Sequence, residues 1–409
     1  MAISKRKSSK PKTVIAILLL IVIIVYVGLC LWLPLKALTA AKSASVFNVT
    51  TPVSSLPWPN YGEAAVGLAS GQVVQTHGQQ KPLPTASVAK LITALAVLKK
   101  YPLSVGQSGP IITIDATDYA IYGQYIAEQG SIVPVSVGEK LSELNMLEAM
   151  LVPSGDNIAD ALARWAYGSL TNYQNYANTF VKQLGLNNTH IGVDASGYSP
   201  TTTSTPRDLI KIGADVMANP VLAQIVNMKS VNVPNVGVLN NYDNQLGVDG
   251  IIGIKTGNSN QAGGVFLGAE TTKINNKVIT LLTAIMGAPT LTQALSGTRP
   301  LAVALENDFS ESVLISKGEV LGEFTQPWGG TIQIAAKNNL SSYGLLGQSQ
   351  PIYLEINPLK LPANAGKTIG SISSPANQLN SFRSVPLVIV QTPTKPSWLW
   401  RILHPNNIF

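Results

Sequence analysis

The stretch Pro84-Thr85-Ala86-Ser87-Val88-Ala89-Lys90-Leu91 opens a strongly apolar segment that runs on to Lys100. Its apolar positions recur with the spacing of a buried helix, so we predict a helix over residues 87–100. Positions i and i+3 share one face of a helix, which would place Ser87 and Lys90 side by side. A serine hydroxyl becomes a strong nucleophile when a neighbouring base takes its proton, and a desolvated lysine beside a second cation can be that base. Ser87 and Lys90 are therefore candidate catalytic residues.

A second motif, Lys255-Thr256-Gly257, ends the apolar run 251–254 and is followed by Asn258. On a strand, Lys255 and Gly257 would face the same side. A glycine beside a cleft lets a substrate backbone approach the strand, and a lysine next to hydroxyl groups can hold a carboxylate. Taken alone, the tripeptide is equally consistent with a surface strand that ends in a turn.

A third motif, Ser154-Gly155-Asp156-Asn157, lies directly before a predicted helix over residues 157–166. Ser154 or Asp156 would serve as an N-cap of that helix, which is a sufficient structural reason for the motif. In a functional reading, Ser154 passes a proton from the lysine to a leaving amine. The Ser-x-x-Lys spacing also occurs at Ser4 and Lys7, so each motif is weak by itself and the combination of the three carries the argument.

The order Ser87, Ser154, Lys255 resembles the signature S-x-x-K, S-x-N and K-T-G of the penicillin-recognising serine enzymes. Within them the chain is most similar to the D-alanyl-D-alanine carboxypeptidases of the low-molecular-mass penicillin-binding proteins. The resemblance runs over about residues 61–392, and it includes Gly185-Leu186-Asn187-Asn188-Thr189-His190 and Ser204-Thr205-Pro206-Arg207-Asp208-Leu209.

The resemblance implies a role for each motif. Ser87 would attack the carbonyl between the last two D-alanines of a peptidoglycan stem peptide, giving an acyl-enzyme, with Lys90 as the base. Ser154 would relay the proton to the departing D-alanine, and Lys255 would hold the carboxylate of that D-alanine. The substrate-binding residues implied besides Lys255 are Thr256, Gly257, Asn258, Asp156 and Asn157.

The same resemblance implies how the intermediate is stabilised and what inhibits the enzyme. The backbone N–H groups of Ser87 and Asn258 would form the oxyanion hole. Water then releases the acyl group, so neither a metal nor an organic cofactor is needed. β-Lactam antibiotics would be covalent inhibitors, and the enzyme would act in cell-wall biogenesis.

The chain departs from the family pattern at the third position of S-x-N, where Asp156 replaces the asparagine and Asn157 comes next. An asparagine amide can donate a hydrogen bond to a substrate carbonyl, whereas an ionised aspartate cannot. An ionised Asp156 would also favour the charged form of Lys90. Three outcomes remain open: Asn157 takes over the role, Asp156 has an altered task, or the activity is low.

Residues 61–300 show predicted strands at both ends and helices between them, which favours an α+β fold with an antiparallel sheet covered by helices, as in the β-lactamase and transpeptidase enzymes. The turn between the last two strands is expected near Asn275-Asn276. The predicted strands are 64–68, 72–75, 264–269 and 278–286, and the further predicted helices are 141–151, 172–184 and 206–217.

Residues 301–392 carry only short strand patterns separated by turn residues, so we predict a second, all-β domain. The tail 393–409 holds Trp398, Trp400 and Arg401, side chains that are favoured at a membrane interface. Packing of this tail on its own domain is the alternative. The predicted strands are 312–316, 320–324, 331–335, 352–356, 368–372 and 385–390.

Residues 13–35 carry no charge and are long enough to cross a bilayer as a helix. Basic residues dominate the preceding tail, 1–12, so we expect a single-pass anchor with the remaining chain outside the cytoplasm. A cleaved signal peptide is the alternative, although its apolar region is normally shorter. Residues 36–60, rich in Ser, Thr and Pro, are expected to be a linker.

Composition excludes several other functions. Residues 1–42 hold seven of the 28 basic residues and no acidic ones, so the rest of the chain, with 21 acidic residues, is neutral. A nucleic-acid-binding function therefore loses its main support. One cysteine and three histidines rule out a disulfide framework and make a metal centre improbable.

Two alternatives to the carboxypeptidase stay open. A class A β-lactamase needs a deacylating glutamate between the second and third motifs, and no glutamate occurs between Asn157 and Lys255. A non-catalytic peptidoglycan-binding homologue is supported only by Asp156. Trapping by penicillin that depends on Ser87 would exclude both.

Overall fold

The computed structural model describes residues 10–51, 54–274, 276–376 and 381–408. It divides into two compact units: residues 53–309, which we call the mixed unit, and residues 1–52 with 310–409, which we call the strand unit. Most of the expected basic tail 1–12 lies outside the described residues, and so does Asn275 in the expected turn.

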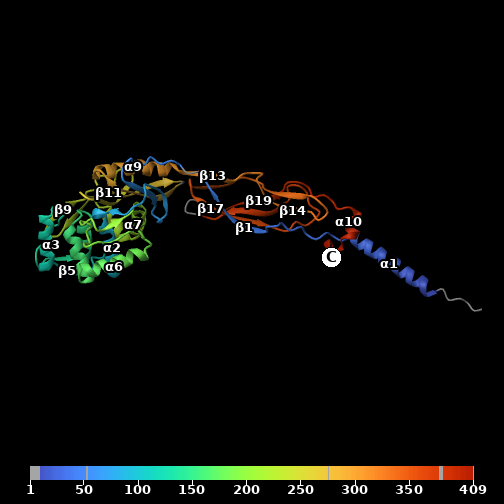
Figure 1. Cartoon of the computed structure of the whole chain (residues 1–409), viewed down its shortest axis with the longest axis horizontal. Coiled ribbons are helices and arrows are strands. Elements are labelled where there is room, and N and C mark those ends of the chain that lie inside the picture. The colour runs from blue at the N-terminus through green and yellow to red at the C-terminus, as the bar shows by residue number, and fades with distance from the viewer. Residues whose placement is uncertain (1–9, 52–53, 275, 377–380, 409) are drawn as a thin grey trace, which may run out of the picture. The chain divides into compact units, whose positions relative to one another are not determined.

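The mixed unit is built on a five-stranded antiparallel sheet in the order β10-β11-β12-β2-β3 (Figure 1). The outermost strand on one side, β10, carries the Lys-Thr-Gly motif and is paired only with β11 within the described residues. The strands are β2 (Glu63–Leu68), β3 (Val73–His77), β10 (Ile251–Ser259), β11 (Gly263–Ile274) and β12 (Lys277–Ala288).

Helices cover both faces of this sheet because both faces are apolar. Successive side chains of a strand point to opposite faces of the sheet. On one face of β12, Leu282 and Ala284 belong to the large core cluster. On the other face, Ile285 lies against Gly297 of helix α9 (Leu291–Asn307). Helix α7 (Pro206–Ala218) packs on β2 and β12. The other helices are α2 (Lys90–Lys100), α3 (Ala116–Ala127), α4 (Glu143–Leu151), α5 (Asp156–Tyr167), α6 (Leu170–Gln183) and α8 (Pro220–Val226).

Short elements connect these helices. A single 3-10 turn, η1 (Ala86–Ala89), leads directly into α2. Two short ladders tie distant loops together: β4 (Leu83–Pro84) with β7 (Thr203–Ser204), and β5 (Ile111–Thr113) with β6 (Lys140–Ser142). A local hairpin pairs β8 (Ser230–Val233) with β9 (Gly237–Asn240).

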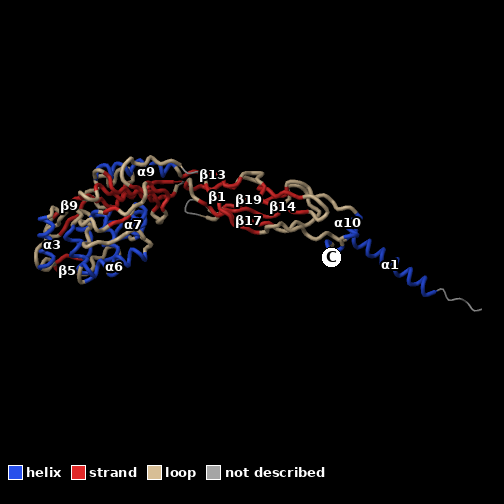
Figure 2. Tube along the Cα trace, in the orientation of Figure 1, coloured by secondary structure: helices blue, strands red, loops and turns tan. Residues whose placement is uncertain are grey.

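The strand unit consists mainly of a six-stranded sheet in the order β1-β17-β18-β19-β15-β14, and it has its own apolar core. Its strands are drawn in red in Figure 2. Strand β13 pairs separately with β16. The strands are β1 (Ala44–Thr50), β13 (Phe309–Ile315), β14 (Val320–Thr325), β15 (Thr331–Ala336), β16 (Leu340–Leu345), β17 (Ser349–Ile356), β18 (Thr368–Ser374) and β19 (Arg383–Ile389).

An apolar helix, α1 (Lys10–Trp32), belongs to the strand unit. Its segment Lys12–Trp32 is long and apolar enough to span a membrane. The C-terminal helix α10 (Trp398–Leu403) lies against the end of α1, where Arg401 Nε donates a hydrogen bond of 2.7 Å to the Cys30 carbonyl oxygen. The expected tail therefore packs on α1 within its own unit; η2 (Pro405–Asn407) follows it.

The structure confirms the fold class and corrects several element assignments. The expected linker 36–60 contains β1, which pairs with β17 along its full length. Its side chains are alternately exposed and half-buried, a strand pattern that the Ser/Thr-rich composition masked. Helix α9 runs past residue 301, where only strands were expected, because Gly297 and Pro300 interrupt its helical pattern in the sequence. Helix α3 was not expected.

Candidate active site

Ser87 is presented by the turn η1 between the sheet and helix α2. Ala86, just before it, has φ of +45°, a backbone conformation that non-glycine residues rarely adopt. Such outliers concentrate at functional sites, where the surrounding structure holds them. Ser87 itself is partly exposed, whereas its neighbours Ala86 and Val88 are buried. The hydroxyl is therefore accessible at the start of an otherwise buried helix.

Lys90 lies one turn later and is completely buried. Its Nζ is 2.8 Å from Ser87 Oγ, 2.6 Å from Asp156 Oδ1 and 3.2 Å from the Ser196 carbonyl oxygen. An ammonium group has three donors, so these three oxygens satisfy it completely. The structure thus brings together Ser87 and Lys90, as the i, i+3 spacing predicted, and adds a carboxylate that pairs with the lysine.

Asp156 is the first residue of helix α5 and is buried. Its Oδ2 accepts a hydrogen bond of 2.7 Å from the Ser131 backbone N–H, so both carboxylate oxygens have partners. A helix N-terminus favours a negative charge. The carboxylate is therefore positioned as the counterion of Lys90.

Asn157 does not enter the site. Its side-chain amide exchanges two hydrogen bonds with the backbone of Val133, of 3.0 Å and 2.9 Å. This geometry ties the loop after α3 to helix α5 and leaves no free amide end for a substrate. The open alternative in which Asn157 takes over the family's asparagine role is thus disfavoured, and Asp156 occupies the position beside Lys90.

Ser154 stands just before α5 and is buried. Its φ of +64° is again in the left-handed region, so the second motif, like the first, contains a strained backbone position. The following Gly155 is closely packed, since a Cβ there would lie 2.9 Å from a methyl of Val133 and 3.0 Å from the Ala149 carbonyl oxygen. The turn is therefore tightly determined by its surroundings.

The third motif lies on the edge strand β10 beside η1. A Cβ on Gly257 would lie 2.9 Å from the Thr85 carbonyl oxygen and 3.3 Å from the Ser87 backbone nitrogen, so only glycine lets the strand approach the nucleophile turn this closely. Lys255 is two residues away and shares that face of the strand. Thr256 is buried, and Asn258 is exposed.

Lys255 is a buried cation without a counterion at bonding distance. Its side chain is 2% exposed, and its Nζ has no hydrogen-bond partner among the described residues. Burial, and then the positive charge of Lys90, lower the pKa of Lys255 to about 7, while Asp156 and Asp243 oppose this shift. An unpaired buried ammonium group beside the nucleophile is suited to accept an anionic group of a ligand.

Sequence reasoning missed the loop that completes the site. Asp194 Oδ1 accepts hydrogen bonds from the backbone N–H groups of Ser196 and Gly197, of 2.9 Å and 2.6 Å, and so holds the loop that delivers the Ser196 carbonyl to Lys90. Tyr125 donates a hydrogen bond of 2.9 Å to Asp160 Oδ2. Burial raises the pKa of Asp160 to about 7.

These roles had no local sequence signal. The segment Asp194-Ala195-Ser196-Gly197 resembles many surface turns, because an aspartate that accepts hydrogen bonds from following N–H groups is a common turn device. Only the tertiary placement of the Ser196 carbonyl against a buried lysine distinguishes it.

A protein-family model described as D-alanyl-D-alanine carboxypeptidase, peptidase family S11, matches residues 63–290. The chain belongs to this family. The match lies within the mixed unit, which holds all three motifs. The protein is a D-alanyl-D-alanine carboxypeptidase of the serine type and acts in cell-wall synthesis.

Curated relatives of this carboxypeptidase have the same description. The chain is 30% identical over 253 residues to a D-alanyl-D-alanine carboxypeptidase of Mycobacterium tuberculosis, covering 58% of this chain and 81% of that protein. It is 27% identical over 244 residues to a D-alanyl-D-alanine carboxypeptidase of a Streptomyces strain, covering 55% of this chain and 81% of that protein.

Solved structures share the fold of the carboxypeptidase. Penicillin-binding protein 5 from Haemophilus influenzae matches with a TM-score of 0.57 and 20% identity, over 83% of this chain and 99% of that one, which shows a shared fold. The D-alanyl-D-alanine carboxypeptidase structure from Mycobacterium tuberculosis matches with a TM-score of 0.53 and 28% identity, over 63% of this chain and 96% of that one.

Proposed function

We propose that Ser87 is the acylated nucleophile with which this carboxypeptidase removes the terminal D-alanine from peptidoglycan stem peptides. The observation that carries the assignment is the 2.8 Å contact between Lys90 Nζ and Ser87 Oγ at the start of a buried helix. Lys90 takes the hydroxyl proton as Ser87 attacks the carbonyl between the two D-alanines. The proton transfer needs the neutral amine of Lys90. The ion pair with Asp156 favours the ammonium form and therefore slows this step.

The remaining residues bind the groups on either side of the scissile bond: the terminal carboxylate, the carbonyl oxygen and the departing amine. Lys255, unpaired and buried, holds the carboxylate of the terminal D-alanine together with Thr256. The N–H groups of Ser87 and Asn258 receive the developing oxyanion. Ser154 returns the proton to the departing amine, after which water hydrolyses the ester on Ser87 and restores the hydroxyl.

Covalent capture of a β-lactam tests this assignment. A β-lactam carries a carboxylate and a reactive amide in the places of the terminal D-alanine and its peptide bond, so it should acylate Ser87 and leave slowly. Mass spectrometry of the protein incubated with penicillin should show one adduct, mapped to the peptide that contains Ser87. No adduct, an adduct elsewhere, or rapid penicillin turnover without an adduct would contradict the proposal.

We also propose that α1 anchors the protein in the cell membrane, with the chain that follows residue 35 on the extracytoplasmic side. The support is the length and apolarity of Lys12–Trp32 and the basic residues before it. Membranes washed at alkaline pH should retain the full-length protein, whereas a protein cleaved after the apolar segment would be released at a lower mass.

A further inference from the structure

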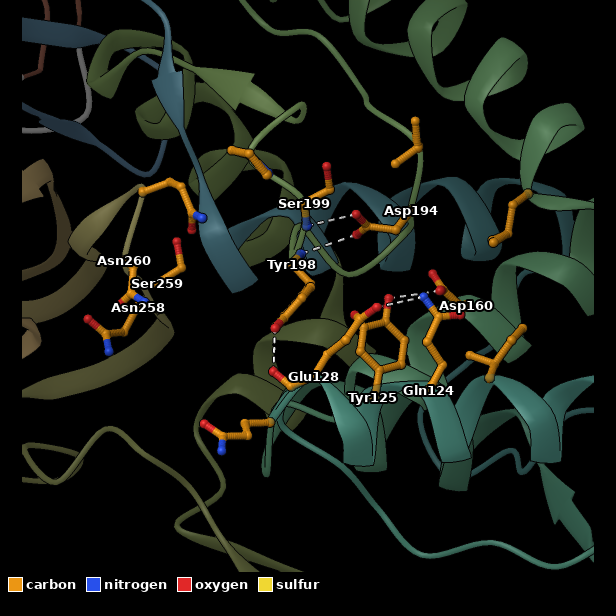
Figure 3. Close-up of a pocket in the computed structure, with 16 residues that line it drawn as sticks. Gln124, Tyr125, Glu128, Asp160, Asp194, Tyr198, Ser199, Asn258, Ser259 and Asn260 are labelled. Carbon is orange, nitrogen blue, oxygen red and sulfur yellow. Dashed lines mark hydrogen bonds between the residues drawn. The ribbon is translucent and has the colours of Figure 1, made fainter.

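The mixed unit contains a cleft of about 670 Å³, whose lining residues are drawn in Figure 3. It lies between the end of helix α3, the loop 193–200 and the turn that follows strand β10. Amide and hydroxyl side chains dominate its wall, so it is suited to a polar ligand rather than to an apolar one. The lining residues that matter for its chemistry are Gln124, Glu128, Asp160, Asp194, Tyr198 and Asn258.

Two walls of the cleft belong to segments that also build the reaction centre. Asn258 lines it and directly follows Gly257, which faces the backbone nitrogen of Ser87. The loop of Tyr198 forms another wall, and the same loop supplies the Ser196 carbonyl oxygen to Lys90 at 3.2 Å. A ligand in the cleft would therefore lie beside the acylated serine.

The charge of the cleft is negative. Three carboxylates line it, and no lysine or arginine is among its lining residues. Asp194 is occupied by backbone N–H groups, and Asp160 is 4% exposed and bonded to Tyr125. Glu128 differs from both, because it is exposed at the C-terminal end of α3, where the Gln124 amide donates a hydrogen bond of 3.0 Å to its carboxylate.

The position of Glu128 is fixed from the opposite wall. Tyr198 Oη donates a hydrogen bond of 2.5 Å to the Glu128 carbonyl oxygen and so spans the cleft, as the dashed line in Figure 3 shows. The ring of Tyr198 packs edge-on against Tyr125 at 5.5 Å. The backbone of Glu128 is thus fixed at the cleft, and its exposed carboxylate, bonded to the neutral Gln124 amide, has no cationic partner among the described residues.

The site as a whole is therefore dipolar. The buried cations Lys90 and Lys255 lie at the reaction centre, and the exposed carboxylate of Glu128, which no cation neutralises among the described residues, lies in the adjoining cleft. A ligand that complements both ends has a carboxylate at one end and a cation farther along the chain. A stem peptide has this arrangement when the residue before the two D-alanines carries a free side-chain amine.

We propose that this cleft binds the side-chain ammonium group of the residue that precedes D-alanyl-D-alanine, with the Glu128 carboxylate as its counter-charge. This inference rests on the proposed function and names the stem-peptide chemistry that the enzyme prefers. Glu128 is a specificity-determining residue in this scheme, and it has no part in proton transfer or in acylation.

The test compares two synthetic substrates that differ only in one charge. These are acetyl-lysyl-D-alanyl-D-alanine with a free side-chain amine and the same peptide with that amine acetylated. Released D-alanine is measured with D-amino-acid oxidase to give kcat/KM. We expect the wild type to prefer the free amine, and we expect the preference to shrink as salt is raised, because a partly exposed ion pair is screened.

Variants at Glu128 assign the preference to one side chain. Glu128→Gln should lower kcat/KM for the free-amine peptide by about three- to five-fold, the range of a partly exposed ion pair, and should leave the acetylated peptide unchanged. Glu128→Asp should keep most of the preference. Glu323→Gln, the same charge change at an exposed position of the strand unit, should change neither peptide. The acylation rate with benzylpenicillin, which carries no amine, should be equal in all four proteins.

The outcomes separate this inference from the function on which it rests. If the wild type releases D-alanine from both peptides equally well, the carboxypeptidase stands and the inference is wrong. If Glu128→Gln weakens both peptides alike, or slows penicillin acylation as well, Glu128 is structural and the inference is again wrong. If neither peptide is hydrolysed and penicillin does not label Ser87, the proposed function fails and the inference falls with it.

Discussion

Lys90 Nζ lies 2.6 Å from Asp156 Oδ1, and both side chains are buried. The pair couples the first and second motifs of the site, because Lys90 belongs to the helix of the nucleophile and Asp156 begins helix α5. It also poses a chemical conflict. An ionised carboxylate at this distance favours the ammonium form of the lysine, whereas the attack by Ser87 needs the neutral amine.

Asp156→Asn should retain or raise the rate of acylation by labelled penicillin, by up to about tenfold, because it removes the charge that favours protonated Lys90. An amide can still accept the Ser131 N–H with its oxygen and donate with its nitrogen to a neutral Lys90. The rate is read as the second-order rate of fluorescent penicillin labelling.

Asp215→Asn is the matched control for this change, since it removes a half-buried carboxylate on helix α7 that is not bonded to Lys90. It should leave the labelling rate unchanged. A large loss of labelling in a folded Asp156→Asn protein would mean that the carboxylate itself takes part in the proton transfer.

Gly257→Ala should lower penicillin acylation by at least about tenfold. Its Cβ would lie 2.9 Å from the Thr85 carbonyl oxygen, so the nucleophile turn and strand β10 must separate. A displacement of about 1 Å at reacting groups is sufficient for a loss of this size. The labelling rate and the melting temperature are measured together.

Gly123→Ala supplies the control, because nothing lies within 4 Å of a Cβ at this position of helix α3. It should leave labelling unchanged and stabilise the protein by up to about 1 kcal/mol. Normal labelling in Gly257→Ala would show that the close approach of β10 to Ser87 is not required for the reaction.

The sequence predicted the parts of the site that depend on local spacing. Ser87 and Lys90 share a face because they are three residues apart in a helical region, and Lys255 and Gly257 share a face because strand side chains alternate. The role of Asn157 was left open, and in the structure helix α5 presents its amide to the Val133 backbone. Whether Asp156 or Asn157 faces Lys90 depends on the residue at which helix α5 begins, and the motif alone does not determine that residue.

The parts that could not be predicted depend on tertiary placement. Strand β1 pairs with β17, a partner some three hundred residues away along the chain, so its composition alone resembled that of a linker. Helix α9 was missed because Pro300 normally interrupts a helix, yet packing on β11 and β12 maintains it. The Ser196 carbonyl reaches Lys90 through a loop whose turn sequence carries no information about its target.

Lys255→Arg should remove the alkaline limb of the pH–rate profile. In the wild type, kcat/KM for a D-alanyl-D-alanine peptide should fall as pH rises above about 7, because the pKa of Lys255 is lowered to about 7 and only its ammonium form holds the substrate carboxylate. Arginine stays charged throughout, so the limb should move beyond the measured range even if the maximal rate is lower. An unchanged limb in Lys255→Arg would assign the titration to another group.

Glu143→Gln should stabilise the protein at pH 8 and have no effect at pH 4. Glu143 is fully buried, neither of its carboxylate oxygens has a hydrogen-bond partner among the described residues, and burial raises its pKa to about 7. Its pKa in the unfolded chain is lower, so the folded protein binds more protons between these values and the wild type loses stability as pH rises through them.

The glutamine variant carries no charge at either pH, so its gain in the free energy of unfolding should be about 1–3 kcal/mol at pH 8 and should vanish at pH 4. Chemical denaturation at both pH values measures this difference. Penicillin labelling serves as a second readout, and it should be unaffected because Glu143 begins helix α4, away from the three motifs. A stabilisation of equal size at both pH values would show that removal of the charge is not its cause.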